Sequence, residues 1–123
     1  MKIFLMMPAV GKPTMVRGDK WKERPCVLAY RAFCDALRYK AFGKNTKQKL
    51  ASPAALSVTC YFRAKEIIWD NRPHAVKPDA DNILKAVSDA LFSNDHMIYR
   101  THCEKYWSMS KDMVIVEMVE STS

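Results

Sequence analysis

The change of hydrophobic period along the chain constrains its fold more than any other feature. Residues 56–63 alternate between apolar and polar side chains, which predicts a strand with one buried face. From residue 81 or 82 to residue 92, apolar side chains recur at helical spacing instead. Residues 97–107 and 112–119 return to strand-like patterns, the second of them more buried. This part of the chain is therefore expected to run strand, helix, strand, strand.

The N-terminal part adds one strand and one helix. Residues 2–7 predict a buried strand, and a polar, basic loop follows at 8–24. Pro25 suits the first turn of a helix, where its missing N–H costs nothing, and Gly43 favours a helix end. The expected core face of this helix carries Cys26, Ala29, Tyr30, Phe33, Cys34, Leu37 and Ala41. The predicted order is β-α-β-α-β-β, which makes the chain a single α+β domain with two main helices.

Length and charge bound the class of protein. One domain spanning residues 1–123 can bury roughly two-thirds of its unfolded surface, so it needs no disulfides to fold. Lys and Arg outnumber Asp and Glu by 20 to 13, which gives a net charge of +7. This excess favours a polyanionic partner, with nucleic acid first and an anionic membrane second.

Cysteine spacing and hydropathy favour a cytoplasmic protein outside the membrane. The four cysteines form no C-x-x-C pair, so we interpret them as free thiols in a reducing cytoplasm rather than as zinc ligands. The apolar start of the chain is short, is interrupted by Pro8 and lacks a cleavage site, so a strand fits it better than a signal peptide. No run approaches the ~20 apolar residues that span a membrane.

A short acidic segment stands out in this basic chain. Asp79 and Asp81 come just before or at the start of the predicted second helix, and Asp95 follows its end. Residues two apart point the same way in a strand-like segment, so there Asp79 and Asp81 would share a divalent metal ion. Carboxylates without His or Cys partners favour Mg²⁺ or Mn²⁺ over Zn²⁺. Because the helix is about 16 Å long, Asp95 lies near its far end unless the chain folds back.

The same residues also have a purely structural interpretation. With Asp81 at zero on a helical wheel, Lys85 and Asp89 fall at about 40° and 80°, away from the apolar arc. Asp81–Lys85 and Lys85–Asp89 would then be i,i+4 ion pairs. Either Asp81 or Asn82 would serve as a helix N-cap, and Asp95 would be a turn residue. The residues alone leave both interpretations open.

The string K-P-D-A-D-N-I-L-K at 77–85, followed by D-A-L at 89–91 and N-D at 94–95, resembles the RusA-type Holliday junction resolvases. These are small basic endonucleases common in phages and prophages. The resemblance is strongest over residues 77–98 and is collinear over the rest of the chain. It implies a mixed β-sheet packed with helices and a cytoplasmic enzyme of a bacterial host cell.

The resemblance also implies residue roles. Asp79, Asp81 and Asp95 match the metal-binding acids, Lys85 matches an active-site lysine, and Asp89 matches a supporting position. The implied enzyme is a homodimer that uses Mg²⁺, or Mn²⁺, to nick four-way DNA junctions in recombination and repair, with no small-molecule substrate. Asn94 departs from the family, because relatives often have a second Asp there. The N-terminal loop around Gly11 is only loosely similar.

Basic residues in the two loops expected beside the acidic segment are candidate DNA contacts. They are Lys12, Arg17, Lys20, Lys22, Arg24, Arg72 and Lys77. Trp21 or Trp69 would stack on an unpaired base. Two alternatives remain: an endonuclease of the same fold that cuts other branched DNA, and a non-catalytic nucleic-acid-binding protein whose acids only brace the helix.

Overall fold

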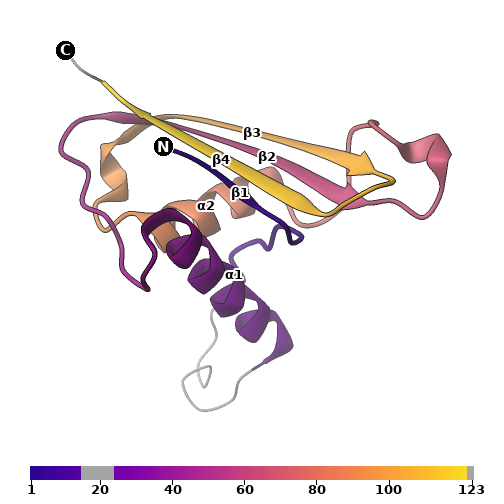
Figure 1. Cartoon of the computed structure of the whole chain (residues 1–123), viewed down its shortest axis with the longest axis horizontal. Helices are drawn as coiled ribbons and strands as arrows, with labels where there is room; N and C mark the ends of the chain where they lie inside the picture. The colour runs from indigo at the N-terminus through magenta and orange to yellow at the C-terminus, as the bar shows by residue number, and fades with distance from the viewer. Residues whose placement is uncertain (15–23, 122–123) are drawn as a thin grey trace.

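The computed structural model describes residues 1–14 and 24–121, which form a four-stranded sheet and two helices (Figure 1). The predicted β-α-β-α-β-β order and the α+β class are confirmed. The main elements are β1 (Lys2–Leu5), α1 (Pro25–Phe42), β2 (Ala54–Arg63), α2 (Ala80–Leu91), β3 (Ile98–Ser108) and β4 (Met113–Glu120). Two short 3-10 helices, η1 (Ile67–Trp69) and η2 (Asp95–Met97), lie before α2 and before β3.

The sheet is mixed, as the family resemblance implies. Its strand order is β1-β4-β2-β3, in which β2 and β3 are parallel and the other pairs are antiparallel. Parallel neighbours need a crossover, and α2 provides it. The N-terminus of α2 therefore follows the carboxyl end of β2, while its C-terminus leads through η2 to the amino end of β3 (Figure 1).

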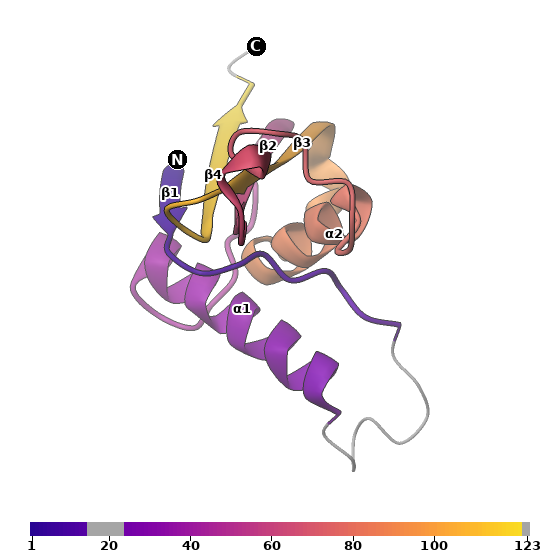
Figure 2. The same ribbon diagram turned by 90° about the vertical axis from the view of Figure 1, so that its right-hand side faces the viewer.

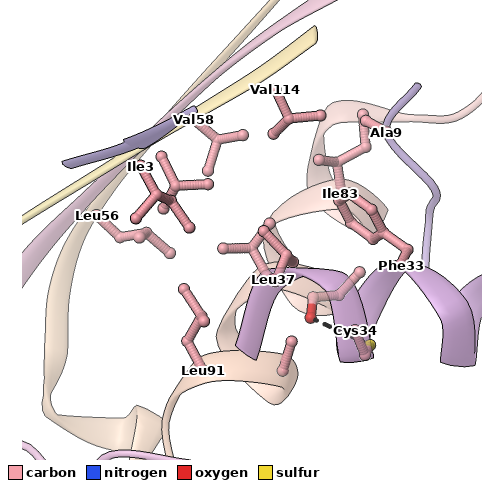
Figure 3. Close-up of a cluster of buried hydrophobic side chains, with 14 of the residues drawn as sticks. Ile3, Ala9, Phe33, Cys34, Leu37, Leu56, Val58, Ile83, Leu91 and Val114 are labelled. Carbon is pink, nitrogen blue, oxygen red and sulfur yellow. Dashed lines mark hydrogen bonds between the residues drawn. The ribbon is translucent and has the colours of Figure 1, made fainter. Parts of the chain in front are cut away.

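Both helices cover the same face of the sheet, and the core lies between them and the strands (Figures 1 and 2). The buried side chains of α2 are those of its predicted apolar arc: Ile83, Ala86, Val87, Ala90 and Leu91. They meet Leu56 and Val58 of β2 and Val114 of β4 in one hydrophobic cluster (Figure 3). Burial of this face orients α2 and leaves its acidic residues toward solvent or toward α1.

Helix α1 is rotated slightly from the predicted orientation. Val27 is fully buried, whereas Cys26 and Ala29, which were expected on the core face, are exposed. The helix residues in the hydrophobic core cluster include the fully buried Phe33 and Leu37. Gly43 ends the helix as predicted, with a left-handed φ of 71° that favours glycine.

Strand β3 contains an irregularity that the alternating pattern did not predict. Ile98 pairs with Ala54 but Arg100 pairs with Ala55, so Tyr99 is an extra residue in the ladder. The alternation of residues 97–107 predicts Tyr99 on the same face as Cys103 and Trp107, and this prediction is wrong: Tyr99 is 65% exposed, and the extra residue reverses the faces before Cys103. Beyond this bulge, Cys103 and Trp107 pack against the core as expected.

The four cysteines are free thiols, as predicted. Cys34 and Cys60 are buried, Cys103 is partly buried and Cys26 is exposed. None of the helices in the described part of the chain has the length and apolar character needed to cross a membrane.

Candidate active site

Asp79 stands at the N-terminus of α2 without capping it. It is the N-cap residue, with extended backbone angles, yet its side chain makes no capping hydrogen bond. Its exposed carboxylate has no hydrogen bond or ion pair with any residue in the described ranges. Capping by Asp81 or Asn82 is therefore wrong, because the helix begins at Ala80. The segment is also not strand-like through Asp81, because Asp79 is extended whereas Asp81 lies in the first helical turn, so the strand geometry expected to align the two carboxylates is absent.

Asp81 lies in that first turn, where the helix dipole favours negative charge. The Lys85 ammonium lies 3.1 Å from Asp81 Oδ2, which confirms the predicted i,i+4 pair. Both side chains are well exposed, at 77% for Asp81 and 59% for Lys85. An exposed ion pair of this kind contributes only about 0.2–1 kcal/mol to stability, so another ion can displace either partner.

Asp89 turns toward the N-terminal segment and α1 instead of toward Lys85. Its carboxylate forms an ion pair with Lys12 and accepts a hydrogen bond from the Tyr30 hydroxyl at 3.4 Å. Burial, reinforced by Cys34 and Asp89, raises the pKa of Tyr30, so the hydroxyl remains a donor. These contacts make Asp89 a structural link between α1, α2 and the N-terminal segment.

The N-terminal segment reaches the start of α2 at Gly11. The backbone N–H of Lys12 donates to the carbonyl of Asn82 at 3.0 Å. A Cβ at position 11 would lie 3.1 Å from the Cβ atoms of both Asn82 and Pro78, so only glycine permits this approach without displacement. The weak sequence similarity of this loop to the family gave no sign of the contact.

A hollow of about 350 Å³ opens where these segments meet. Its lining comprises Gly11, Lys12, Lys77, Pro78, Asp79 and Asn82. The structure thus brings two of the candidate DNA contacts, Lys12 and Lys77, into the lining of one hollow with Asp79. Lys12 is already paired with Asp89, whereas Lys77 is exposed.

Lys105 supports this site and was missed by the sequence analysis. It lies on the same face of β3 as Cys103 and Trp107, and its ammonium donates to the carbonyls of Val76 and Pro78, both at 2.8 Å. Pro78 immediately precedes Asp79, so Lys105 holds the backbone that leads into the helix. A lysine at a core-facing position of a strand was the signal available in the sequence.

His74, a residue that the sequence analysis did not single out, is buried. Its ring stacks on Phe62, with centroids 4.1 Å apart, and contacts Trp107 at 4.3 Å. Burial, together with the charge of Lys105, lowers the pKa of His74, so the imidazole is neutral at pH 7. Its backbone N–H donates to the Lys105 carbonyl. This hydrogen bond is a further connection between β3 and the loop before Asp79.

Asp95 lies at the opposite end of α2 from Asp79 and Asp81. It opens η2, just before β3, and α2 separates it from Asp79 by about 18 Å of helix (Figure 1). The chain does not fold back to bring Asp95 to the pair. Within residues 1–14 and 24–121, no three His, Cys, Asp or Glu side chains form a group that would hold a metal ion.

Asn94 has a structural function beside Asp95. Its amide accepts a hydrogen bond from the Leu50 N–H at 2.8 Å and donates to the Leu50 carbonyl at 2.9 Å. The side chain thereby anchors the connector between α1 and β2.

The remaining candidate DNA contacts are spread over the surface or lie outside the described residues. Arg72 is exposed in the loop after η1. Arg24 donates from Nη2 to the Thr14 carbonyl at 2.9 Å, next to α1. Arg17, Lys20, Lys22 and Trp21 lie outside the described residues.

Comparison with protein families agrees with this architecture. The model of the family described as endodeoxyribonuclease RusA matches residues 11–118, which include every element from α1 to most of β4. A search of curated proteins found no match. The match spans most of the chain and includes the carboxylates at the start of α2, so the chain belongs to the RusA endodeoxyribonuclease family.

Proposed function

We propose that this protein is a Mg²⁺-dependent endodeoxyribonuclease that resolves four-way DNA junctions by paired nicking. The observation that carries the proposal is the unpaired, exposed carboxylate of Asp79 beside Asp81 at the start of α2. A carboxylate that neither caps its helix nor pairs with a cation has no structural task within the described residues. Family membership supports the reaction class, and the net charge of +7 supports an anionic polymer as substrate.

The donor chemistry at the start of α2 fits Mg²⁺. This ion is commonly bound through one or two carboxylates, with substrate phosphate oxygens and water completing its shell. Asp79 and Asp81 would supply the two carboxylates, and their exposure leaves room for a phosphate. When bound, the ion would supply an activated water and would offset charge on the phosphate.

The basic residues beside the carboxylates would position the DNA strand. Lys77 lines the hollow with Asp79 and would contact a phosphate flanking the scissile bond. Lys85 would exchange its pairing with Asp81 for a contact to the phosphate, where its charge would stabilise the transition state. Lys12, held by Asp89, would contribute to the potential of the hollow rather than move.

A homodimer would explain how Asp95 takes part. Asp95 lies at the far end of α2 from the other two acids within one chain. If all three acids serve one site, as the family resemblance implies, Asp95 must come from a second copy. Two such sites related by a two-fold axis would suit symmetric nicking of a junction.

A cleavage assay on a mobile four-way junction tests the proposed activity. Asp79→Asn should lower Mg²⁺-dependent cleavage by at least about 100-fold while junction binding is retained, because only metal binding is impaired. Asp35→Asn, which removes an acid from α1 away from the site, is the matched control. Cleavage by Asp79→Asn at the wild-type rate would instead support a non-catalytic binding protein. Faster cleavage of flaps or forks than of the junction would favour the alternative substrate.

Mixing two inactive variants tests the role of a second copy. In a mixed dimer of Asp79→Asn and Asp95→Asn chains, one of the two shared sites would be wholly wild type and the other would carry both substitutions. Such a mixture should therefore recover nicking of one strand. If each site is built within one chain, no mixture recovers activity.

A further inference from the structure

A second, mostly apolar hollow of about 560 Å³ lies at the carboxyl ends of β2 and β3. Its walls include Trp69, Trp107, Pro73 and Val76, and its rim includes Arg63 and Lys65. None of the proposed metal ligands belongs to it. Its volume is in the range of pockets that hold small organic ligands.

An aromatic stack leads from the core to this hollow. Phe62 stacks on His74, His74 contacts Trp107, and Trp107 faces Trp69 with ring centroids 6.5 Å apart and planes inclined at 55°. The stack passes from buried rings to the indole of Trp69, which is 48% exposed. It therefore ends in an aromatic surface that no other described ring covers.

The loop that carries Trp69 is held in place by hydrogen bonds. The backbone N–H of Trp69 donates to the Glu66 carbonyl at 3.1 Å, and the carboxylate of Asp70 accepts from the Met109 N–H at 2.9 Å. The N–H of Asn71 donates to the Trp107 carbonyl at 3.0 Å. The two indoles are thus positioned before any ligand arrives, which lowers the entropy cost of binding.

The charged residues around the hollow indicate which kind of ligand it can bind. Arg63 and Lys65 line it, Arg72 is exposed in the same loop, and Glu66 is the acidic residue among its lining residues. Aromatic walls with a cationic rim match a nucleotide, because the base stacks on the rings and the phosphate meets the cations. A purely apolar partner surface would gain nothing from the basic side chains.

One lysine connects this hollow to the candidate active site. Val76 is part of its wall, and the Lys105 ammonium binds the carbonyls of both Val76 and Pro78. Asp79 follows Pro78 directly. A strand whose phosphate lies at Asp79 would therefore pass within a few nucleotides of the two indoles.

We propose that the Trp69–Trp107 hollow binds an unstacked base of the DNA strand that is cut at Asp79. This inference deepens the proposed function and rests on it for the identity of the strand. An unpaired base at a branch point would enter the hollow and stack on Trp69, while Arg63 and Lys65 would contact its flanking phosphates. The hollow would thereby favour branched over fully paired DNA.

Binding to two matched junctions tests the hollow. One junction carries an unpaired nucleotide at the branch, and the other carries an abasic residue there; both are measured by fluorescence anisotropy with EDTA present. The wild type should bind the base-containing junction about 5- to 150-fold more tightly, the range that corresponds to stacking of one base. Trp69→Ala should abolish this preference, whereas Trp69→Phe should keep most of it.

Ile67→Ala is the matched control, because Ile67 is 78% exposed in the same loop but does not line the hollow. It should leave the preference unchanged. A wild-type preference below about two-fold, or one that survives in a folded Trp69→Ala protein, would overturn the inference. So would loss of self-association in Trp69→Ala with no base preference, because the hollow would then be covered by a second copy.

Cleavage of a fully paired four-way junction with Mg²⁺, measured in parallel, separates this inference from the proposed function. Cleavage without a base preference would refute the hollow alone. A base preference without cleavage would support the hollow and count against the nuclease activity.

Discussion

Replacing Lys105 with methionine should weaken both the fold and the cleavage activity. The Lys105 ammonium donates to the carbonyls of Val76 and Pro78, each at 2.8 Å. Methionine keeps the aliphatic part of the side chain on the core-facing side of β3 but removes both hydrogen bonds. The backbone that leads into Asp79 would then lose its attachment to the sheet.

The expected magnitude follows from the exposure of the two carbonyls. The contact with Val76 is exposed, so its carbonyl would be rehydrated at a cost of about 0.5 kcal/mol. The contact with Pro78 is partly buried, and its loss should cost about 1–2 kcal/mol. The free energy of unfolding should therefore fall by about 1–3 kcal/mol. A displacement of Asp79 on the order of 1 Å would lower the cleavage rate by about 10- to 100-fold.

Urea unfolding and junction cleavage at saturating Mg²⁺ measure the two effects. Lys49→Met is the control, because Lys49 is exposed in the connector between α1 and β2 and its removal changes the net charge equally. If Lys49→Met reduces cleavage as much as Lys105→Met, the effect is one of overall charge. If the cleavage rate of Lys105→Met is within two-fold of the wild-type rate, the hydrogen bond from Lys105 to the Pro78 carbonyl does not position Asp79.

Two further substitutions test other contacts. Burial lowers the pKa of His74 below its unfolded value of 6.5, so the unfolded chain binds a proton before the folded chain does. The free energy of unfolding should therefore fall as the pH drops through 6.5, by at most ~1.4 kcal/mol per pH unit. His74→Phe should remove this part of the pH dependence, measured by urea unfolding at pH 7.5, 6.5 and 5.5. If the free energies of unfolding of the wild type and the variant fall in parallel with pH, the prediction is refuted. Asn94→Asp keeps the acceptor for the Leu50 N–H but loses the donor to the Leu50 carbonyl. The free energy of unfolding, measured by thermal unfolding, should therefore fall by about 1–2 kcal/mol. An unchanged stability would contradict the anchoring role of Asn94.

The elements were predictable because each has a strong local signal. The apolar arc of α2 allowed only one orientation on the sheet, and Pro25 and Gly43 marked both ends of α1. The alternation in β2 survived intact because its partners on both sides keep register beyond Ala55. In β3 the same rule failed at Tyr99, because an extra residue in the ladder reverses the faces and leaves no mark in the sequence.

Contacts between distant segments were not predictable in the same way. Lys105 and His74 act through backbone carbonyls and ring stacking, which depend on how the loop before α2 lies against β3. Gly11 is favoured by the close approach of Asn82 in α2 and of Pro78 in the loop before it. A single sequence indicates residue types at such positions but not the partner, so a lysine and a histidine that fix the loop look like surface residues.

The position of Asp95 follows from topology rather than from side-chain detail. When two adjacent parallel strands are joined by a helix, that helix runs back along the sheet, so residues before it and after it lie at opposite ends. Asp79 and Asp95 flank α2 in this way, and no rotamer change spans the length of the helix. If both bind one metal ion, two chains must supply them. Metal binding and dimer formation would then be linked, since Mg²⁺ would stabilise the dimer by its preference for the completed site.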